Sequence, residues 1–216
     1  MDEKLLLILN HNWTHPALDR VMAAASSLDL WMPLLVLGVI LLAWKGGFRE
    51  RAFLVCTLLT ICVMDGIVSN GLKHLVDRPR PFQARTGVRI VTLAPAIPRL
   101  LALGLPVRVK ASRAAQGDVD GRSFPSGHTI NTFSVATLSA LFFRRGWLVY
   151  LAAGLVGYSR VYTGSHWPTD VLISAMLATG CTLMLAVLFE KLWDLIGPRR
   201  FPGLHSAHPN LRMETP

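Results

Sequence analysis

The sequence predicts an all-α protein that is embedded in a membrane as a bundle of about five spanning helices. Two features support this fold class. First, 52% of the 216 residues are hydrophobic and only 16% are charged, which is little charge for a water-soluble domain. Second, the apolar residues gather in runs that are long enough, or nearly long enough, to cross a bilayer, and short turns rich in arginine, glycine and proline separate the runs.

The N-terminal part of the chain combines a polar start with two apolar runs. Residues 1–29 are interrupted by polar groups too often to span a bilayer, so we expect an N-terminal interfacial helical segment there. Acidic residues open the chain, and no cleavable signal peptide is expected. Spans are predicted at residues 30–44 and 52–72, with a basic turn between them. Asp65 is the one charged residue of the second span, and we expect it to face the interior of the bundle.

Arginine and proline are frequent in residues 75–122, which are predicted to form an insertion outside the membrane, most of it at about 82–122. The middle of this segment, residues 90–109, is apolar enough to lie on the membrane or to cover a pocket. Its prolines exclude a straight spanning helix.

Three more spans are predicted after the insertion, at residues 127–143, 147–161 and 168–193. Residues 197–216 are predicted to be a polar C-terminal tail. No internal repeat or domain boundary is evident, so residues 1–196 are expected to form a single membrane-embedded domain.

The distribution of charge predicts the topology. With five spans, the short basic turns and the tail lie on one side of the membrane, which the positive-inside tendency identifies as cytoplasmic. The N-terminal segment and the insertion then lie on the extracytoplasmic side, which for a bacterial protein means the outer face of the inner membrane. The formal net charge of +9 suits an anionic membrane surface or a phosphate-bearing substrate, and the apolar runs favour these over nucleic acid.

The same count of spans brings three polar stretches to one membrane face, as happens when a site is assembled inside a helix bundle. The first stretch, residues 73–81, offers Lys73 and Arg80 as cations. The prolines on both sides of Arg80 force an extended, stiff backbone that fixes where its side chain points. Taken alone, this stretch is equally compatible with a basic anchor beside the membrane.

The second stretch, residues 123–129, opens an apolar helix with a proline and a glycine. Free backbone N–H groups at such a start, together with the hydroxyl of Ser126, are suited to hold an anion. His128 lies at the edge of this cradle and can exchange a proton near physiological pH. The structural alternative is a helix capped by serine, with an incidental histidine.

The third stretch, residues 159–170, supplies Arg160, whose planar guanidinium suits bidentate binding of phosphate. His166 and Asp170 follow, four residues apart. A carboxylate near one ring nitrogen would fix the tautomer and leave the other nitrogen free to attack, which describes an activated histidine nucleophile. The structural alternative is an interfacial hydrogen bond between these two side chains.

In combination, the stretches match Lys-x6-Arg-Pro, Pro-Ser-Gly-His and Ser-Arg-x5-His-x3-Asp, in this order. By these motifs, residues 52–185 resemble the type 2 phosphatidate phosphatase superfamily, which includes the vanadium haloperoxidases, and specifically its integral-membrane lipid phosphatases. The resemblance implies that His166 is the nucleophile that forms a phosphohistidine, that Asp170 orients it, and that His128 is the general acid that protonates the leaving oxygen. It also implies a set of groups that hold the phosphate, namely Lys73, Arg80, Arg160, Ser126 and the amide of Gly127.

What the resemblance implies about substrate is less specific. The form of the motif at residues 121–128 and the size of the chain are similar to small bacterial members that hydrolyse undecaprenyl diphosphate, which is the leading candidate. Phosphatidylglycerol phosphate, phosphatidic acid and the phosphates of lipid A are alternatives. Transfer of the phosphoryl group to a lipid acceptor is a second class of activity. A non-enzymatic membrane scaffold is a third, and the full set of motifs argues against it.

No metal or other cofactor is expected, because three fixed cations neutralise the phosphate in this scheme and the sequence has no cluster of acidic residues. The three cysteines lie in apolar runs without the spacing of metal ligands. The expected partners are the lipid substrate and the bilayer. Neither nucleic acid nor an obligate protein partner is inferred.

Overall fold

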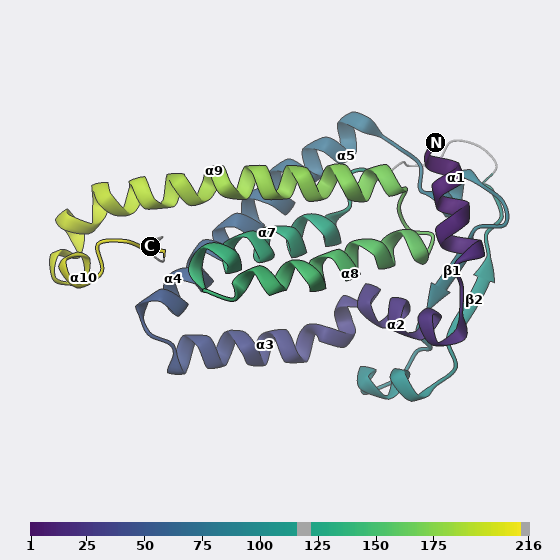
Figure 1. Cartoon of the computed structure of the whole chain (residues 1–216), viewed down its shortest axis with the longest axis horizontal. Helices are drawn as coiled ribbons and strands as arrows, with labels where there is room; N and C mark the ends of the chain where they lie inside the picture. The colour runs from purple at the N-terminus through teal and green to yellow at the C-terminus, as the bar shows by residue number, and fades with distance from the viewer. Residues whose placement is uncertain (116–121, 213–216) are drawn as a thin grey trace.

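The computed structural model describes residues 1–115 and 122–212 and is mostly helical (Figure 1). Residues 116–121 of the predicted insertion and residues 213–216 of the predicted tail lie outside the described part. The elements in chain order are α1 (Asp2–Leu7), η1 (Ile8–Asn12), α2 (Pro16–Ser26), α3 (Leu28–Lys45), α4 (Phe48–Val63), η2 (Met64–Ser69), α5 (Asn70–Val76), α6 (Pro81–Ala84), β1 (Arg89–Thr92), η3 (Arg99–Gly104), β2 (Arg108–Ala111), α7 (Gly127–Phe142), η4 (Gly146–Leu148), α8 (Val149–Tyr162), α9 (Pro168–Arg200) and α10 (Pro202–Ala207).

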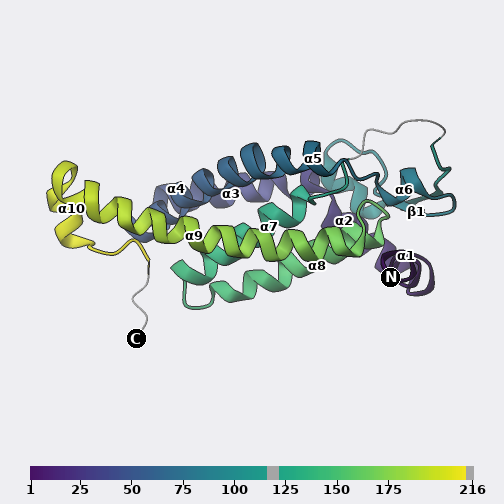
Figure 2. The ribbon, with the colours of Figure 1, turned by 90° about the horizontal axis from the view of Figure 1, so that it is seen from above.

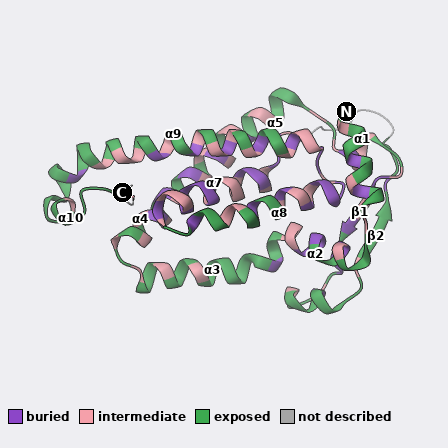
Figure 3. Cartoon of the chain, viewed as in Figure 1, coloured by how far each residue is buried: buried purple, intermediate pink, exposed green. Residues whose placement is uncertain are grey.

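Three helices in the described part of the chain are long and apolar enough to cross a membrane: Leu28–Lys45, Phe48–Ala84 and Pro168–Arg200. They correspond to the first, second and fifth predicted spans. The third and fourth predicted spans also form helices, but α7 has 16 residues and α8 has 14, fewer than the ~20 that usually cross a bilayer. Side chains along α3 are exposed and apolar on most of its circumference, as expected of a helix that faces lipid (Figure 3).

Helix α7 forms the centre of the bundle and packs against α4, α8 and α9 (Figure 2). Its buried face carries small and hydroxyl-bearing residues, which allow neighbouring helices to approach closely. Close approach is also visible between α8 and α9, because a Cβ atom on Gly157 would lie 3.0 Å from Cγ1 of Val171. The central helix is therefore held from three sides, and its N-terminus has a fixed position.

The N-terminal helices and the insertion gather at one end of the bundle (Figure 1). The insertion contains a small antiparallel sheet of β1 and β2, in which Arg89 pairs with Ala111 and Thr92 with Arg108. This sheet departs from the all-α prediction. Each strand has four residues, which is too short for an alternating pattern to be distinguished from an irregular loop.

A buried polar network fastens the N-terminal segment to this end of the bundle. Asp19 of α2 accepts hydrogen bonds of 2.9 and 2.8 Å from Arg89, and one of 2.5 Å from the hydroxyl of Tyr162. The side-chain amide of Asn10 donates to the carbonyls of Arg89 and Tyr162. The C-terminal end of α8 is therefore fixed, two residues beyond Arg160.

At the opposite end of the bundle, α9 continues to Arg200. It passes residue 193, where the fifth span was predicted to end, and the beginning of the predicted tail at 197. Pro198 lies in the last turn, where the lost hydrogen bond affects only an exposed helix end. The tail then folds back, and Glu190 accepts hydrogen bonds from the backbone amides of Leu211 and Arg212.

Candidate active site

The three polar stretches converge at the end of the bundle that carries the insertion. His166 lies in the turn between α8 and α9 and is 3% exposed, and Asp170 lies in the first turn of α9 and is fully buried. The charges of Arg160, Arg80 and His128 all act on the imidazole of His166. The structure thus brings together side chains from α7, from the end of α8 and from the residues before α6.

The hydrogen bond that His166 makes determines its tautomer. Its Nδ1 lies 2.6 Å from the backbone carbonyl oxygen of Ser123, which can only accept a hydrogen bond. Nδ1 therefore carries the proton, and Nε2 keeps a free lone pair. Burial first, and then the positive charges of Arg160 and Arg80, hold the pKa of His166 well below its usual value. The ring is thus neutral, and the lone pair of Nε2 is not used by the hydrogen bond to Ser123.

Asp170 lies near the ring but makes no direct hydrogen bond to it. Its Oδ2 is 4.0 Å from Nδ1 of His166 and accepts instead from the hydroxyl of Ser123 at 2.5 Å and from the amide of Trp167 at 3.0 Å. The physical reason is that Asp170 caps the start of its own helix, so its carboxylate turns toward free amides. Asp170 therefore acts on His166 through Ser123, whose side chain it holds and whose carbonyl holds the ring.

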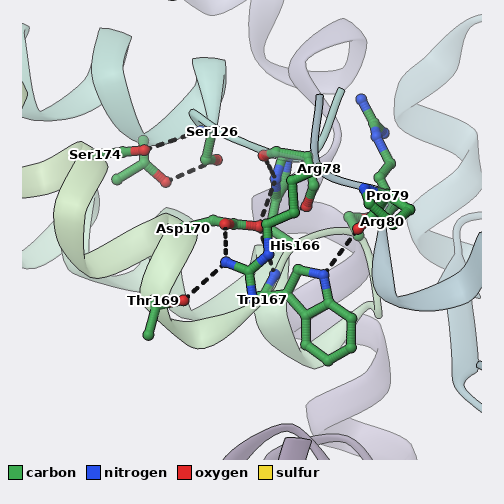
Figure 4. A network of polar contacts seen from close by, with 12 residues as sticks. Arg78, Pro79, Arg80, Ser126, His166, Trp167, Thr169, Asp170 and Ser174 are labelled. Carbon is green, nitrogen blue, oxygen red and sulfur yellow. Dashed lines mark hydrogen bonds and ion pairs between the residues drawn. The ribbon is translucent and has the colours of Figure 1, made fainter. Parts of the chain in front are cut away.

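Arg78 completes this arrangement, and it is a residue to which sequence analysis assigned no role (Figure 4). Its guanidinium donates to Oδ1 of Asp170 at 2.6 Å, to the hydroxyl of Thr169 at 2.9 Å and to Asp2 at 2.5 Å, and it lies over the ring of Trp167. The tandem Arg-Pro pairs were the available signal. Each proline restricts the backbone of the arginine before it, and the side chains of Arg78 and Arg80 point to different parts of the site.

Asp2 is the second residue that the sequence analysis missed. It accepts hydrogen bonds from the amide and hydroxyl of Thr169 at 3.1 and 2.6 Å, as well as from Arg78. Burial raises the pKa of Asp2, but the hydrogen bonds from Thr169 and Arg78 outweigh this and hold it below the usual value. No pattern near residue 2 could indicate this contact, because its partners lie 76 and 167 residues away.

The start of α7 has the features of an anion cradle. A Cβ atom on Gly127 would lie 3.5 Å from Oδ1 of Asp65 and 3.9 Å from Nζ of Lys73, so both side chains reach this helix terminus. The predicted inward orientation of Asp65 is confirmed. The amide of Ser126 is already used, since it donates to the hydroxyl of Ser174 at 2.9 Å. The hydroxyl of Ser126 accepts from Thr129 and keeps its own proton for a ligand.

Two guanidinium groups, those of Arg80 and Arg160, act on the charge of His128 in the first turn of α7. Arg80 has an extended backbone between its two prolines, as predicted, with φ −71° and ψ 154°. Arg160 donates from Nη1 to the carbonyl and the hydroxyl of Ser26, at the junction of α2 and α3. Within the described residues, Nε of Arg160 is buried and has no hydrogen-bond partner. A buried guanidinium N–H without a partner is costly unless an anion binds to it.

His128 is placed among these cations. The charges of Arg160, Arg80, Lys73 and Asp65 all act on its imidazole. His128 is therefore a second imidazole of the described site, and it lies beside the cations that act on His166. Among residues 1–115 and 122–212, no group of three or more histidine, cysteine or acidic residues is arranged to hold a metal ion. The described site thus combines two imidazoles and a buried carboxylate with several cations.

Comparison with known proteins agrees with this arrangement. A family model described as the PAP2 superfamily matches residues 53–194, about two thirds of the chain. A lipid A 4'-phosphatase from Bacteroides thetaiotaomicron is 28% identical over 184 residues, which cover 82% of this chain and 72% of that protein. The undecaprenyl-diphosphatase BcrC from Bacillus subtilis is 33% identical over 136 residues, which cover 62% of this chain and 55% of that protein.

A solved structure has a similar fold. The crystal structure of LpxE from Aquifex aeolicus superposes with a TM-score of 0.57 at 23% identity, covering 85% of this chain and 93% of that chain. At this identity the likeness concerns the fold alone. It extends beyond the region that the family model matches and includes most of the bundle.

Proposed function

Because the chain belongs to the PAP2 superfamily, we propose that it is a membrane lipid phosphatase that hydrolyses a phosphoric ester or anhydride through a phosphohistidine on His166. One observation carries the mechanism: the carbonyl of Ser123 holds the proton on Nδ1, so that Nε2 is a free nucleophile in a buried, cationic site. Attack by a histidine on a phosphate needs both features, since the substrate is anionic and the nucleophile must stay unprotonated.

In the first step, Nε2 of His166 attacks phosphorus and the bond to the lipid oxygen breaks. His128 donates its proton to that leaving oxygen. The negative charge of the bound phosphate favours the protonated form of His128, so the substrate itself prepares the acid. The ring of His166 becomes positively charged, and the carbonyl of Ser123, with Asp170 behind it, stabilises this charge.

The phosphoryl oxygens are bound by three cations, Lys73, Arg80 and Arg160. The buried Nε of Arg160 gains a partner only when the phosphate is bound. The hydroxyl of Ser126 and the amide of Gly127 add uncharged donors at the start of α7. These groups stabilise the charge that spreads over the phosphoryl oxygens in the transition state.

In the second step, water attacks the phosphohistidine. His128, which has lost its proton to the lipid oxygen, accepts a proton from this water. The bond between phosphorus and Nε2 breaks, inorganic phosphate leaves, and His166 and His128 return to their starting states. The chain's own residues balance every proton in this cycle, and no metal ion takes part in it.

Undecaprenyl diphosphate is the leading substrate of the proposal, with phosphatidylglycerol phosphate, phosphatidic acid and lipid A phosphates as alternatives. The relative named undecaprenyl-diphosphatase supports the leading substrate, and the relative named lipid A 4'-phosphatase supports lipid A phosphates as an alternative. The proposal includes α7 and α8 as two short spans, which makes five in total. The site then faces the extracytoplasmic side of a bacterial inner membrane, and the basic turns and tail face the cytoplasm.

The test is phosphate release by the purified protein from a panel of these lipids in mixed micelles. We expect turnover with at least one lipid, and none by His166→Ala. His74→Ala is the matched control, since His74 is an exposed histidine of α5 outside the site. Quenching the wild type in alkali should trap an acid-labile phosphoprotein that the His166→Ala variant does not form. Equal turnover by His166→Ala would contradict the mechanism, and labelled lipid in place of free phosphate would indicate transfer to an acceptor.

A further inference from the structure

The insertion exposes a cluster of aliphatic side chains that the proposed reaction does not use. Ile97 is 97% exposed and Leu101 is 59% exposed, and three further leucines of the same stretch are also exposed. We call this cluster the aliphatic lobe; its members are Ile97, Leu100, Leu101, Leu103 and Leu105. Five exposed aliphatic side chains within nine residues are typical of an interaction site.

The inner side of η3 fastens the aliphatic lobe to the bundle. Ala102 is fully buried and belongs to a core cluster with Leu30 of α3 and Met22 of α2. Arg99, the first residue of η3, forms an ion pair of 2.6 Å with Asp29 in the first turn of α3. Figure 1 shows η3 as the unlabelled teal helix beside the α2–α3 junction. The lobe therefore has a fixed position next to the start of α3.

The length of α3 indicates how deep in the bilayer the aliphatic lobe lies. Its 18 residues make a helix of about 27 Å, slightly less than the ~30 Å of the hydrocarbon core of a bilayer. The helix is apolar and largely exposed along its length, so all of it has to lie in lipid. The first turn of α3 is then at the boundary between acyl chains and head groups. Side chains held against that turn lie at the same level.

Exposed cations lie on the other side of the lobe from α3. Arg108 and Lys110 are exposed on β2, which follows η3 and pairs with β1 (Figure 3). Aliphatic side chains flanked by basic residues are the composition of a segment that lies in a membrane interface, because the cations can pair with lipid phosphates while the aliphatic groups enter the leaflet.

We propose that the aliphatic lobe is a membrane-docking surface of the insertion. It enters the acyl-chain region of the leaflet at the active-site end of the bundle, with Arg108 and Lys110 at the level of the phospholipid head groups. The lobe continues the lipid-facing surface of α3, with which η3 is in contact. This continuity favours a bilayer over a second copy of the chain or a protein partner as the occupant.

The test measures depth directly. The three cysteines are replaced by alanine, and one cysteine at a time is introduced and labelled with an environment-sensitive fluorophore: Ile97→Cys, Leu101→Cys, Lys110→Cys, Val36→Cys or Ala114→Cys. The full-length protein is placed in lipid nanodiscs that contain nitroxide lipids, labelled either on the head group, at a shallow acyl carbon or at a deep acyl carbon. Phosphate release by each labelled protein shows that it is folded.

We expect each label to be quenched most by the nitroxide that lies at its own depth in the bilayer. Labels at 97 and 101 lose most of their fluorescence with the shallow acyl nitroxide, and the label at 110 with the head-group nitroxide. Val36, exposed in the middle of α3, is the control for deep quenching. Ala114, exposed beyond β2, is the control for water and should be quenched by none of the lipids.

Two results would overturn the proposal. If labels at 97 and 101 behave like the label at 114, the lobe lies in water. If they are shielded from all three lipids and also from aqueous iodide, another protein surface covers the lobe, and a cross-link between two chains would identify it as a second copy. A label at 110 that behaves like the label at 114 would overturn the assignment of the basic strand to the head groups.

Discussion

The contact between Arg78 and Asp170 allows the most specific test of how the site is held. Replacing Arg78 by glutamine removes the cation that binds both Asp170 and Asp2 and leaves the fully buried Asp170 with Ser123 and Trp167 as donors. A hydrogen bond to a charged group contributes about 1.5–3 kcal/mol. Because the side chain of Arg78 is 32% exposed, the lower end of that range applies to each of its two ion pairs.

This estimate gives two expected magnitudes. The free energy of unfolding should fall by about 3 kcal/mol for the two ion pairs together. The effect on catalysis passes through Asp170 alone, so about 1.5 kcal/mol is lost from the transition state, which corresponds to a roughly tenfold decrease in kcat. KM should change little, because the guanidinium of Arg78 is bound to Asp170, Thr169 and Asp2 and does not contact the phosphate site.

The assay compares Arg78→Gln with Arg85→Gln at a temperature where both are folded, measuring kcat, KM and the rate of phosphoenzyme formation. Arg85 is the matched control, because it also pairs with the N-terminal helix, at 2.8 Å from Glu3, but both of these side chains are exposed. Such a pair contributes little. An unchanged kcat in Arg78→Gln would refute the role assigned to Arg78. An equal loss in Arg85→Gln would mean that the N-terminal helix matters and the contact with Asp170 does not.

Three further outcomes are expected. Arg160→Lys keeps the charge but loses the planar fork and the buried Nε, so kcat/KM should fall about a hundredfold in the lipid assay. Burial holds the pKa of His166 below its usual value, so the imidazole stays neutral as the pH falls. The fall of kcat/KM on the acid side that is due to His166 should therefore lie below pH ~6.5. A fall above that pH would contradict the assignment of His166 as the nucleophile. Gly157→Ala places a Cβ atom 3.0 Å from Val171 and should cost about 1–3 kcal/mol in unfolding free energy, whereas Gly154→Ala on the same helix meets nothing within 4 Å and should be neutral or stabilising.

Much of the bundle could be predicted from the sequence because the membrane imposes a strong pattern. The helix predicted at residues 127–143 is observed as Gly127–Phe142, and the one predicted at 30–44 as Leu28–Lys45. The hairpin of the insertion could not be predicted, because strands of four residues carry no usable periodicity. Helix α9 continues to Arg200, past the predicted end of the fifth span at 193, because a proline in the last exposed turn costs little.

The sequence predicted those residues of the site whose charged side chains are unusual in apolar surroundings. His166, Arg160 and Asp170 stood out because ionisable groups beside membrane spans need a reason to be there. The spacing of four residues predicted only that the carboxylate of Asp170 lies near the ring of His166, and it did not identify the group that accepts the hydrogen bond from Nδ1. In the structure the backbone carbonyl of Ser123 makes that bond. A backbone acceptor leaves no trace in the identity of the residue that provides it, so sequence reasoning has no means of finding it.

Some of the groups that hold the site in place come from outside the region that the family model matches. That region begins at residue 53, whereas Asp2 binds Arg78, Ser26 binds Arg160, and Asp19 binds Tyr162 near the end of α8. Each of these contacts restrains a segment that carries a group of the proposed reaction. The matched region thus carries the groups of the proposed reaction, and the N-terminal segment hydrogen-bonds to Arg160 and Arg78 within that region.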